Sequence, residues 1–234
     1  MLLRQLIDKT TSTYTYILAD TDNGDALIID PVLEQNQRDL QAIKELGLNL
    51  KTILETHIHA DHITGADSLR KETGAKCAVS ASSGAENADL LLNDGDILQF
   101  GKHSLEVRAT PGHTAGCVTY VLDAQIMAFT GDTLMIRGCG RTDFQQGSPE
   151  ELYASVREKI FSLPDTCLIY PGHDYQGRTV STVAEEKAHN PRLGKDIPLE
   201  TFITIMQELD LAYPAKIDVA LPANMRCGAA TDSE

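Results

Sequence analysis

The sequence predicts an α+β fold, in which sheets carry helices on their outer faces, formed by a single domain over residues 1–234. Hydrophobic residues make up 42% of the chain, which is enough for a large core. Short apolar runs with strand character alternate with segments of helical periodicity in both halves. No Ser-, Gly- or Pro-rich linker interrupts the chain, so residues 177–234 are expected to form a C-terminal helical extension packed on the rest.

The first half alternates strands with short helices. Residues 14–30 place two apolar runs around the turn-forming pair Asn23-Gly24, which predicts a β-hairpin. Residues 30–48 carry apolar side chains at helical spacing and end beside Gly47, a suitable residue for a helix C-terminus. A buried strand at 50–56 and a short helix at 63–75 follow, and then five further strands at 76–81, 96–101, 103–110, 117–123 and 125–132.

The second half continues in the same way. Residues 148–163 predict a helix, with Ser148 as its N-cap and Glu151 three positions later, the arrangement of a capping box. A strand is expected at 166–174. Helical segments at 181–190 and 199–211 and a closing segment at 217–228 complete the chain.

The overall charge excludes several classes of partner. A net charge of −14 argues against a nucleic-acid-binding surface and against a polybasic membrane contact, because both need clustered Lys and Arg. No run approaches the roughly 20 apolar residues of a membrane helix. The N-terminus lacks the apolar core and cleavage pattern of a secretory signal. We therefore expect a cytoplasmic protein with no membrane segment.

Cysteine usage agrees with that location. The five cysteines are odd in number, widely spaced and without a C-x-x-C pair, which predicts reduced thiols and not a disulfide framework or a structural zinc site. Cys117 and Cys227 are expected to pack as small apolar side chains, since a redox role would need a lowered pKa.

Side chains that bind metals gather where predicted strands end. The segment THIHADHITG (56–65) follows an apolar strand, and three further donors each follow another strand and are directly preceded by Gly. Glycine permits tight turns and close backbone approach. Packing alone does not explain four strand ends that each present such a side chain, so we expect a metal site. The seven donors are His57, His59, Asp61, His62, His113, Asp132 and His173.

The donor set leaves two arrangements open. Imidazole and carboxylate without a thiolate suit several metals. All seven donors could hold two metal ions bridged by Asp132, which would activate a water for hydrolysis. Alternatively, two His and one Asp could hold one Fe(II), with positions free for substrate and O₂. Spacing does not decide between them, and Asp61 could also cap the helix predicted after it.

The motifs THIHADH, GHTAG, TGDTL and YPGHD, in this order, resemble those of the metallo-β-lactamase superfamily. That resemblance implies an αββα sandwich with metal at one edge of the paired sheets. The stretches GCGRTDFQQG (138–147) and PANMRCG (222–228) resemble the persulfide dioxygenase (sulfur dioxygenase) branch, and the likeness runs over nearly the whole chain. We find neither the longer helical C-terminal domain usual in glyoxalase II nor a rhodanese domain.

The resemblance implies one Fe(II) per chain, held by His57, His113 and Asp132. The other four donors would support this triad without binding the metal: His59, Asp61, His62 and His173. The implied reaction oxidises glutathione persulfide with O₂ and water to sulfite and glutathione. The iron would perform the redox chemistry, and the protein would supply binding and orientation.

Glutathione has two carboxylates, which guanidinium groups bind bidentately. The branch-specific segments supply five candidates for contact with it: Tyr175, Arg178, Arg226, Asn224 and Arg141. Tyr175, directly after the GHD motif, is the best of them. A salt-bridge role is an equal alternative for each arginine, and we expect Arg141 to pair with Asp143.

Two rival functions belong to other classes. One is a dinuclear zinc hydrolase of glyoxalase II (hydroxyacylglutathione thioesterase) type, which would use the same seven donors. The other is a non-catalytic metal-binding protein, which is disfavoured because no donor position is lost. For the assembly we expect a homodimer, the commonest oligomer among such enzymes.

Overall fold

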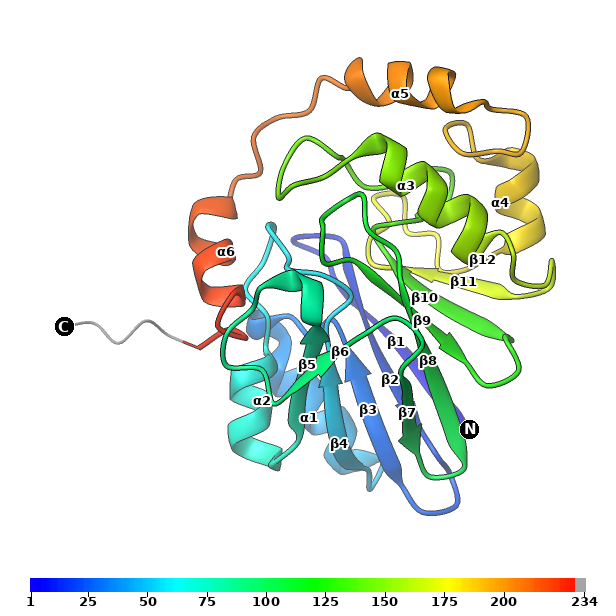
Figure 1. The fold of residues 1–234 in the computed structure, drawn as a ribbon. Coiled ribbons are helices and arrows are strands. Elements are labelled where there is room, and N and C mark those ends of the chain that lie inside the picture. The colour runs from blue at the N-terminus through cyan, green and yellow to red at the C-terminus, as the bar shows by residue number, and fades with distance from the viewer. Residues whose placement is uncertain (230–234) are drawn as a thin grey trace.

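The computed structural model describes residues 1–229 and contains two six-stranded β-sheets packed face to face (Figure 1). The first sheet has its strands in chain order: β1 (Leu2–Asp8), β2 (Thr13–Ala19), β3 (Asp25–Ile29), β4 (Asn49–Leu54), β5 (Lys76–Ser80) and β6 (Leu90–Leu92). The second sheet has the order β12-β11-β10-β9-β8-β7, with β7 (Ile97–Phe100), β8 (His103–Ala109), β9 (Val118–Leu122), β10 (Met127–Gly131), β11 (Leu168–Pro171) and β12 (Ser181–Thr182).

Strand direction determines where the connecting loops lie. β1, β2 and β3 pair antiparallel, whereas β3 through β6 pair parallel. In the second sheet β7 through β10 pair antiparallel and β11 is parallel to β10. The strands β8, β10 and β11 therefore run in one direction, and the loops that follow them leave the sheet at the same edge.

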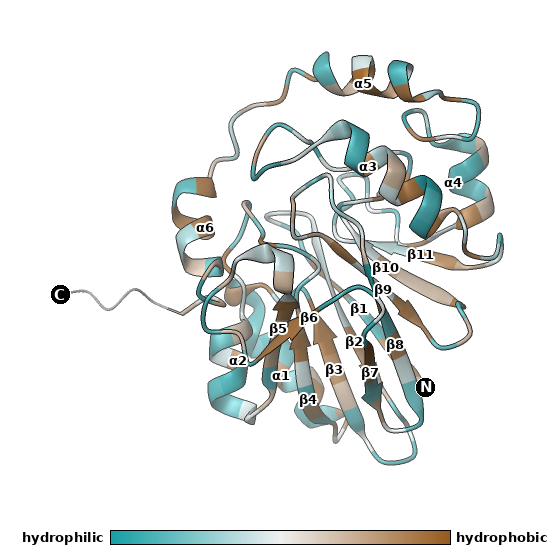
Figure 2. Cartoon of the chain, viewed as in Figure 1, coloured by the Kyte–Doolittle hydropathy of each residue, from teal (hydrophilic) through white to brown (hydrophobic). Residues whose placement is uncertain are grey.

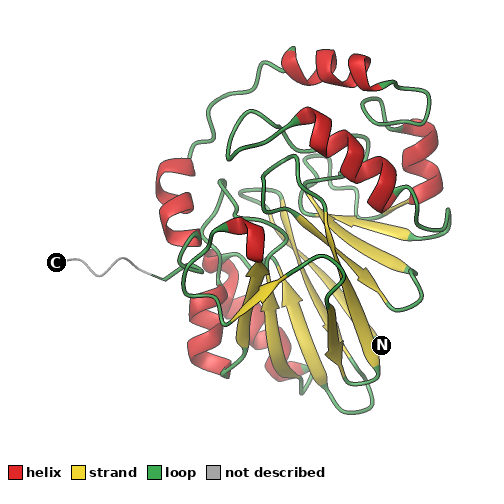
Figure 3. Ribbon diagram, in the orientation of Figure 1, coloured by secondary structure: helices red, strands yellow, loops and turns green. Residues whose placement is uncertain are grey.

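Helices cover the outer face of each sheet, as Figure 3 shows with helices in red around strands in yellow. The helices α1 (Asn36–Glu45) and α2 (Ala66–Thr73) connect the parallel strands of the first sheet. The second sheet is covered by α3 (Pro149–Ser155), α4 (Val183–His189) and α5 (Leu199–Gln207). The last helix, α6 (Ile217–Asn224), lies back beside the first sheet (Figure 1).

Three apolar layers hold the sandwich together. The central layer joins the inner faces of both sheets, for example Leu27 and Leu54 with Tyr120 and Phe129. A second layer lies between the first sheet and α1 and α2, and a third lies between the second sheet and α3, α4 and α5. Hydrophobic residues are concentrated on the strands in Figure 2, as expected for sheets buried on both faces. The predicted αββα layering is confirmed.

Several local elements differ from the sequence prediction. The strands β1, β6 and β12 were not predicted; β1 is an edge strand whose partly exposed residues give no clear apolar run. The helix predicted at 148–163 is α-helical to Ser155 and continues as a π-helical turn over 156–160. Ser148 caps it by accepting from the Glu151 N–H, but the Ser148 N–H donates to the Gly112 carbonyl, so the reciprocal half of the capping box is absent.

Within residues 1–229, no helix is both long enough and apolar enough to cross a bilayer.

Candidate metal centre

The predicted metal donors lie in four loops at one edge of the sandwich. The loop after β4 supplies His57 through His62, and the loops after β8, β10 and β11 supply His113, Asp132 and His173. The Val118 N–H donates to the Thr56 carbonyl at 2.8 Å, which ties the two sheets together at this edge. Each donor follows a strand, as the sequence predicted.

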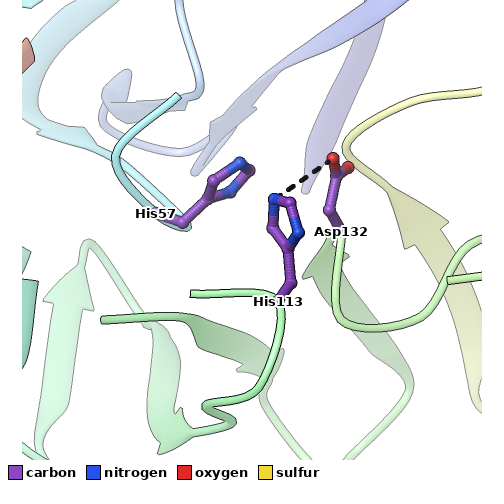
Figure 4. Close-up of side chains that lie close together, drawn as sticks. All are labelled: His57, His113 and Asp132. Atoms are coloured by element: carbon purple, nitrogen blue, oxygen red, sulfur yellow. Dashed lines mark ion pairs between the residues drawn. The ribbon is translucent and has the colours of Figure 1, made fainter. Parts of the chain in front are cut away.

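Three of these side chains converge on one point. One donor atom each of His57, His113 and Asp132 lies within 4.8 Å of the others. Nε2 of His113 is 3.8 Å from Oδ2 of Asp132, and the rings of His57 and His113 meet edge to face with centroids 4.9 Å apart. Figure 4 shows the three side chains, which come from separate loops and point toward one another. Two imidazoles and one carboxylate in this arrangement form a possible face of a metal coordination sphere.

Hydrogen bonds at Nδ1 orient both imidazoles of this triad. Nδ1 of His113 donates to the Arg141 carbonyl at 2.6 Å, so the tautomer that would bind a metal carries its lone pair on Nε2, the nitrogen directed at Asp132. Nδ1 of His57 lies 3.0 Å from the Thr56 hydroxyl, whose own hydrogen goes to Asp30 at 2.8 Å. The Thr56 oxygen must therefore accept from His57, so Nε2 of His57 is also free for a metal. Burial and neighbouring imidazoles hold the pKa of His57 well below its usual value, which favours the neutral ligand form.

Asp132 is ionised and held by His173. Nδ1 of His173 donates to Oδ1 of Asp132 at 2.7 Å, so Oδ2 stays available toward His113. Burial acts to raise the pKa of Asp132, but the charge and hydrogen bond of His173, with smaller contributions from His57 and His113, lower it below the usual range. The carboxylate is therefore charged over the physiological pH range.

The remaining donors extend behind the triad. His173 also reaches Asp61, with Nε2 to Oδ2 at 3.0 Å, and Asp61 pairs with Nδ1 of His62 at 2.9 Å. His59, Asp61 and His62 form a second group whose donor atoms lie within 4.8 Å of one another. Nε2 of His62 and both ring nitrogens of His59 are buried without a hydrogen-bond partner in the described chain. This geometry accommodates either arrangement that the sequence left open.

Asp61 does not cap a helix. The helix α2 starts at Ala66 with Gly65 as its N-cap, and the side chain that accepts from the Ala66 N–H is the Thr64 hydroxyl, at 3.1 Å. The capping role considered for Asp61 is wrong, because the helix begins five residues later and the carboxylate is engaged with His173 and His62.

Two glycines make room for the triad. A Cβ on Gly140 would lie 2.6 Å from Nδ1 of His113, and a Cβ on Gly172 would lie 2.8 Å from Oδ1 of Asp132. Both distances are below any ordinary van der Waals contact. The glycine before His173 is therefore needed because the backbone passes directly against the Asp132 carboxylate, a tighter requirement than the turn expected from sequence.

The triad opens into a cavity of about 520 Å³. His57, His113 and Asp132 line it together with the loop 135–141, the residues after His173 and a strap at 211–214. The strap is fastened by Arg141, whose Nη1 donates to the Ala212 carbonyl at 2.7 Å, and by Tyr213, whose ring meets that of Phe144 edge to face. The volume matches that of a small-molecule site.

The five residues predicted to contact glutathione fall into two groups. Arg141, Tyr175 and Arg178 line the cavity, and Tyr175 is 73% exposed at its rim. Asn224 and Arg226 are not part of the lining. Asn224 is buried, and its amide donates to the carbonyls of His59 and His62 at 2.8 Å each, so it anchors the donor loop from behind.

The expected pairing of Arg141 with Asp143 is present. The guanidinium makes two parallel bonds to the carboxylate at 2.6 Å each. The guanidinium is already bound to Asp143, so a substrate carboxylate that bound Arg141 would have to share the guanidinium with that residue.

Both singled-out thiols are buried. Burial raises the pKa of the Cys117 thiol to about 11, so it stays protonated, consistent with a packing role. Cys227 packs in the layer beneath the first sheet together with Cys77, whose hydrogen bond lowers the Cys227 pKa.

Comparison with known proteins agrees with this geometry. The family model described as the metallo-beta-lactamase superfamily matches residues 9–173. The mitochondrial persulfide dioxygenase ETHE1 of Bos taurus is 57% identical over 232 residues, covering 99% of this chain and 90% of the relative. The crystal structure of ETHE1 from Myxococcus xanthus superposes with a TM-score of 0.94 at 48% identity, covering 98% of this chain and all of that one.

A hydrolase is also similar, but less so. The hydroxyacylglutathione hydrolase of Cereibacter sphaeroides is 33% identical over 185 residues, covering 78% of this chain and 71% of the relative. The chain therefore belongs to the metallo-β-lactamase superfamily and, within it, to the persulfide dioxygenase family.

Proposed function

We propose that this protein is an iron-dependent dioxygenase that oxidises glutathione persulfide with O₂ and water to sulfite and glutathione, with one Fe(II) per chain. The observation that carries the proposal is the triad of His57, His113 and Asp132 at the base of the cavity, in a chain 57% identical to a persulfide dioxygenase. Two imidazoles and one carboxylate are the ligand set typical of non-haem Fe(II) oxygenases.

The donor geometry fits a metal of this kind. Both imidazoles use Nδ1 in a hydrogen bond and have Nε2 left to bind a metal, and Asp132 presents Oδ2 while Oδ1 is occupied by His173. Each of the three residues thus offers one atom, and the same three residues line the cavity, so a metal that they held would be accessible from it. Ferrous iron bound there would supply coordination positions for the persulfide sulfur and O₂ and the redox chemistry that joins them.

The residues of the chain would do the remaining work. His173 keeps its Nδ1 proton directed at Asp132 and its Nε2 directed at Asp61, so the carboxylate cannot rotate. The strap at 211–214 and the loop 135–141 form part of the cavity wall and would exclude some of the water from around a bound sulfur. Tyr175 and the arginines of the wall would hold the glutathionyl part, leaving the terminal sulfur at the base. The balanced reaction consumes the persulfide, O₂ and one water, and releases glutathione, sulfite and two protons.

The alternative is a dinuclear zinc hydrolase that cleaves hydroxyacylglutathione. One observation favours it: His59, Asp61 and His62 form a second donor group behind the triad, in which Nδ1 of His59 and Nε2 of His62 have no hydrogen-bond partner among the described residues. We rank this function second because the chain is 57% identical to a persulfide dioxygenase and 33% identical to a hydroxyacylglutathione hydrolase.

Metal analysis and two assays separate these functions. Anaerobically purified protein should contain one iron per chain and take up one O₂ per glutathione persulfide, with sulfite as the product. Two zinc ions per chain, with hydrolysis of S-D-lactoylglutathione and no O₂ uptake, would reverse the assignment. A cytoplasmic location and a homodimer stay predictions; the similar bovine protein is named as mitochondrial.

A further inference from the structure

Four guanidinium groups line the cavity, and three of them are already paired. Arg141 is bound bidentately to Asp143, and Arg178 contacts Asp174 through Nε at 2.9 Å and Nη2 at 2.8 Å. Arg137 contacts both Glu185 and Glu186. These three charges are neutralised within the wall, so a substrate carboxylate would have to displace or approach a protein carboxylate to reach them.

Arg192 is different. It lines the same cavity, yet no carboxylate among residues 1–229 lies within ion-pair distance of its guanidinium. Among the described residues, its guanidinium donates only to Cys139, from Nη1 to the carbonyl at 3.1 Å and to the thiol sulfur at 3.9 Å. The remaining donors, Nε and Nη2, have no protein partner in that part of the chain and are not buried. A cation with unused donors in a cavity of a chain with net charge −14 is suited to a bound anion.

The backbone holds Arg192 in place before any ligand arrives. The Asn190 side chain accepts from the N–H groups of both Arg192 and Leu193 at 3.0 Å, which fixes the turn after α4. The Cys139 carbonyl that Nη1 contacts belongs to the loop that also carries Gly140, whose N–H donates to the Asp132 carbonyl at 2.6 Å. The loop that contains Cys139 and Gly140 therefore connects the guanidinium to Asp132 of the triad, through one hydrogen bond on each side.

We propose that Arg192 binds a carboxylate of the glutathionyl part of the persulfide and thereby selects substrates that carry that anion. This inference rests on the proposed function, since it names the group that recognises its substrate. A planar guanidinium with two free N–H groups forms paired bonds to a carboxylate. Anchoring one end of the tripeptide leaves its terminal sulfur free to reach the triad.

The test compares two substrates on iron-loaded enzyme. Arg192→Met removes the charge and keeps most of the side-chain volume, and Arg192→Lys keeps the charge without the fork. Oxygen uptake is measured with glutathione persulfide and with the persulfide of glutathione diethyl ester, in which both carboxylates are masked. For Arg192→Met, kcat/KM for glutathione persulfide should fall roughly 10- to 100-fold, mainly through KM, the loss expected for a charge-assisted hydrogen bond. For the ester persulfide it should change less than about 3-fold, and Arg192→Lys should be intermediate.

Equal losses on both substrates would overturn the inference, because they would mean that Arg192 only supports the Cys139 loop. A binding measurement keeps the test separate from the proposed function. Calorimetric titration of the iron enzyme with reduced glutathione should give a Kd that Arg192→Met weakens by a similar factor, with no such change for glutathione diethyl ester. If wild-type protein oxidises neither persulfide but this binding difference appears, the dioxygenase assignment fails and the role of Arg192 stands. If wild-type protein oxidises both persulfides but Arg192→Met binds reduced glutathione as tightly as wild type, the dioxygenase assignment stands and the proposed role of Arg192 fails.

Discussion

The Arg141 carbonyl oxygen accepts a hydrogen bond from Nδ1 of His113 at 2.6 Å. One residue thus sets the tautomer of a metal-ligand candidate through its backbone, while its side chain pairs with Asp143 and fastens the strap at 211–214. Because the two tasks use different atoms, substitutions of the side chain and of the neighbouring glycines should separate metal binding from the shape of the cavity.

Arg141→Met should leave iron content nearly unchanged, because the acceptor for His113 is a backbone oxygen. The variant loses the bonds to Asp143 and to the Ala212 carbonyl, so the strap should loosen. The pair is partly exposed and contributes little to global stability. We expect KM for glutathione persulfide to rise several-fold and proteolytic cleavage near residue 212 to speed up. Iron loss comparable to that of a ligand variant would contradict this division of tasks.

Gly140→Ala should displace His113 and lower iron affinity. The added methyl group would lie 2.6 Å from Nδ1 of His113 and 2.9 Å from the Asp132 carbonyl, so either the ring or the loop must move. Loss of orientation around a metal ligand typically costs about 10- to 100-fold in affinity or activity. Iron stoichiometry after dialysis and the oxygen-uptake rate measure the effect.

Gly138→Ala is the matched control in the same loop. A Cβ at Gly138 has no atom within 4 Å, and its backbone is not in the left-handed region. Its iron content and rate should stay close to wild type. A similar loss in both variants would show that the loop, and not the ring contact, is sensitive.

Asp132→Ala and His59→Ala distinguish the triad from the donors behind it. Asp132 is one of three converging residues, so its removal should abolish stable iron binding and activity. His59 lies 3.2 Å from Asp30 and belongs to the second donor group, so its removal should reduce iron content only in part. Metal analysis of both proteins prepared in parallel decides the point. Iron loss as complete for His59→Ala as for His57→Ala would make His59 a ligand.

Sequence patterns alone located the site but did not select its ligands. The donors were found because His57, His113, Asp132 and His173 each directly follow an apolar strand, a local signal. The choice of three among seven came from family resemblance, because spacing carries no information on which nitrogens converge. Folding brings His113 and Asp132 together through β9 and β10, and the tautomers depend on a carbonyl 28 residues from His113 along the chain.

The cavity wall was less predictable than the metal donors. Arg192 was not singled out from sequence, because its distinction is that no carboxylate among residues 1–229 lies within ion-pair distance of it in three dimensions. Asn224 was predicted to contact glutathione, but it lies outside the cavity lining and contacts the back of the donor loop, with partners more than 160 residues away. The strap was also missed, since the bond from Arg141 to the Ala212 carbonyl spans 71 residues. Long-range polar contacts of this kind leave no periodic signal in the sequence.

The buried Asp39 should make stability fall as pH rises between about 4 and 6. Asp39 lies in α1 with no exposed surface, and burial, which outweighs the charge and hydrogen bond of Arg38, raises its pKa from 3.8 to about 6. A folded-state pKa above the unfolded value means that the folded protein binds the proton more tightly. The stabilising contribution is therefore complete below about pH 4 and is lost as pH rises through 6.

Asp39→Asn removes this titration. Relative to wild type, its free energy of unfolding should be similar or slightly lower near pH 4, because the bond to Arg38 is weakened. By pH 7 its free energy of unfolding should exceed that of wild type by on the order of 2 kcal/mol. The weakened bond to the partly exposed Arg38 makes this difference smaller. Urea denaturation of both proteins at half-unit pH steps measures the difference. Asp210→Asn, at an exposed position without an ion-pair partner among residues 1–229, is the control for removing a carboxylate. A difference between Asp39→Asn and wild type that does not change with pH would mean that the pKa of Asp39 is not raised in the folded state.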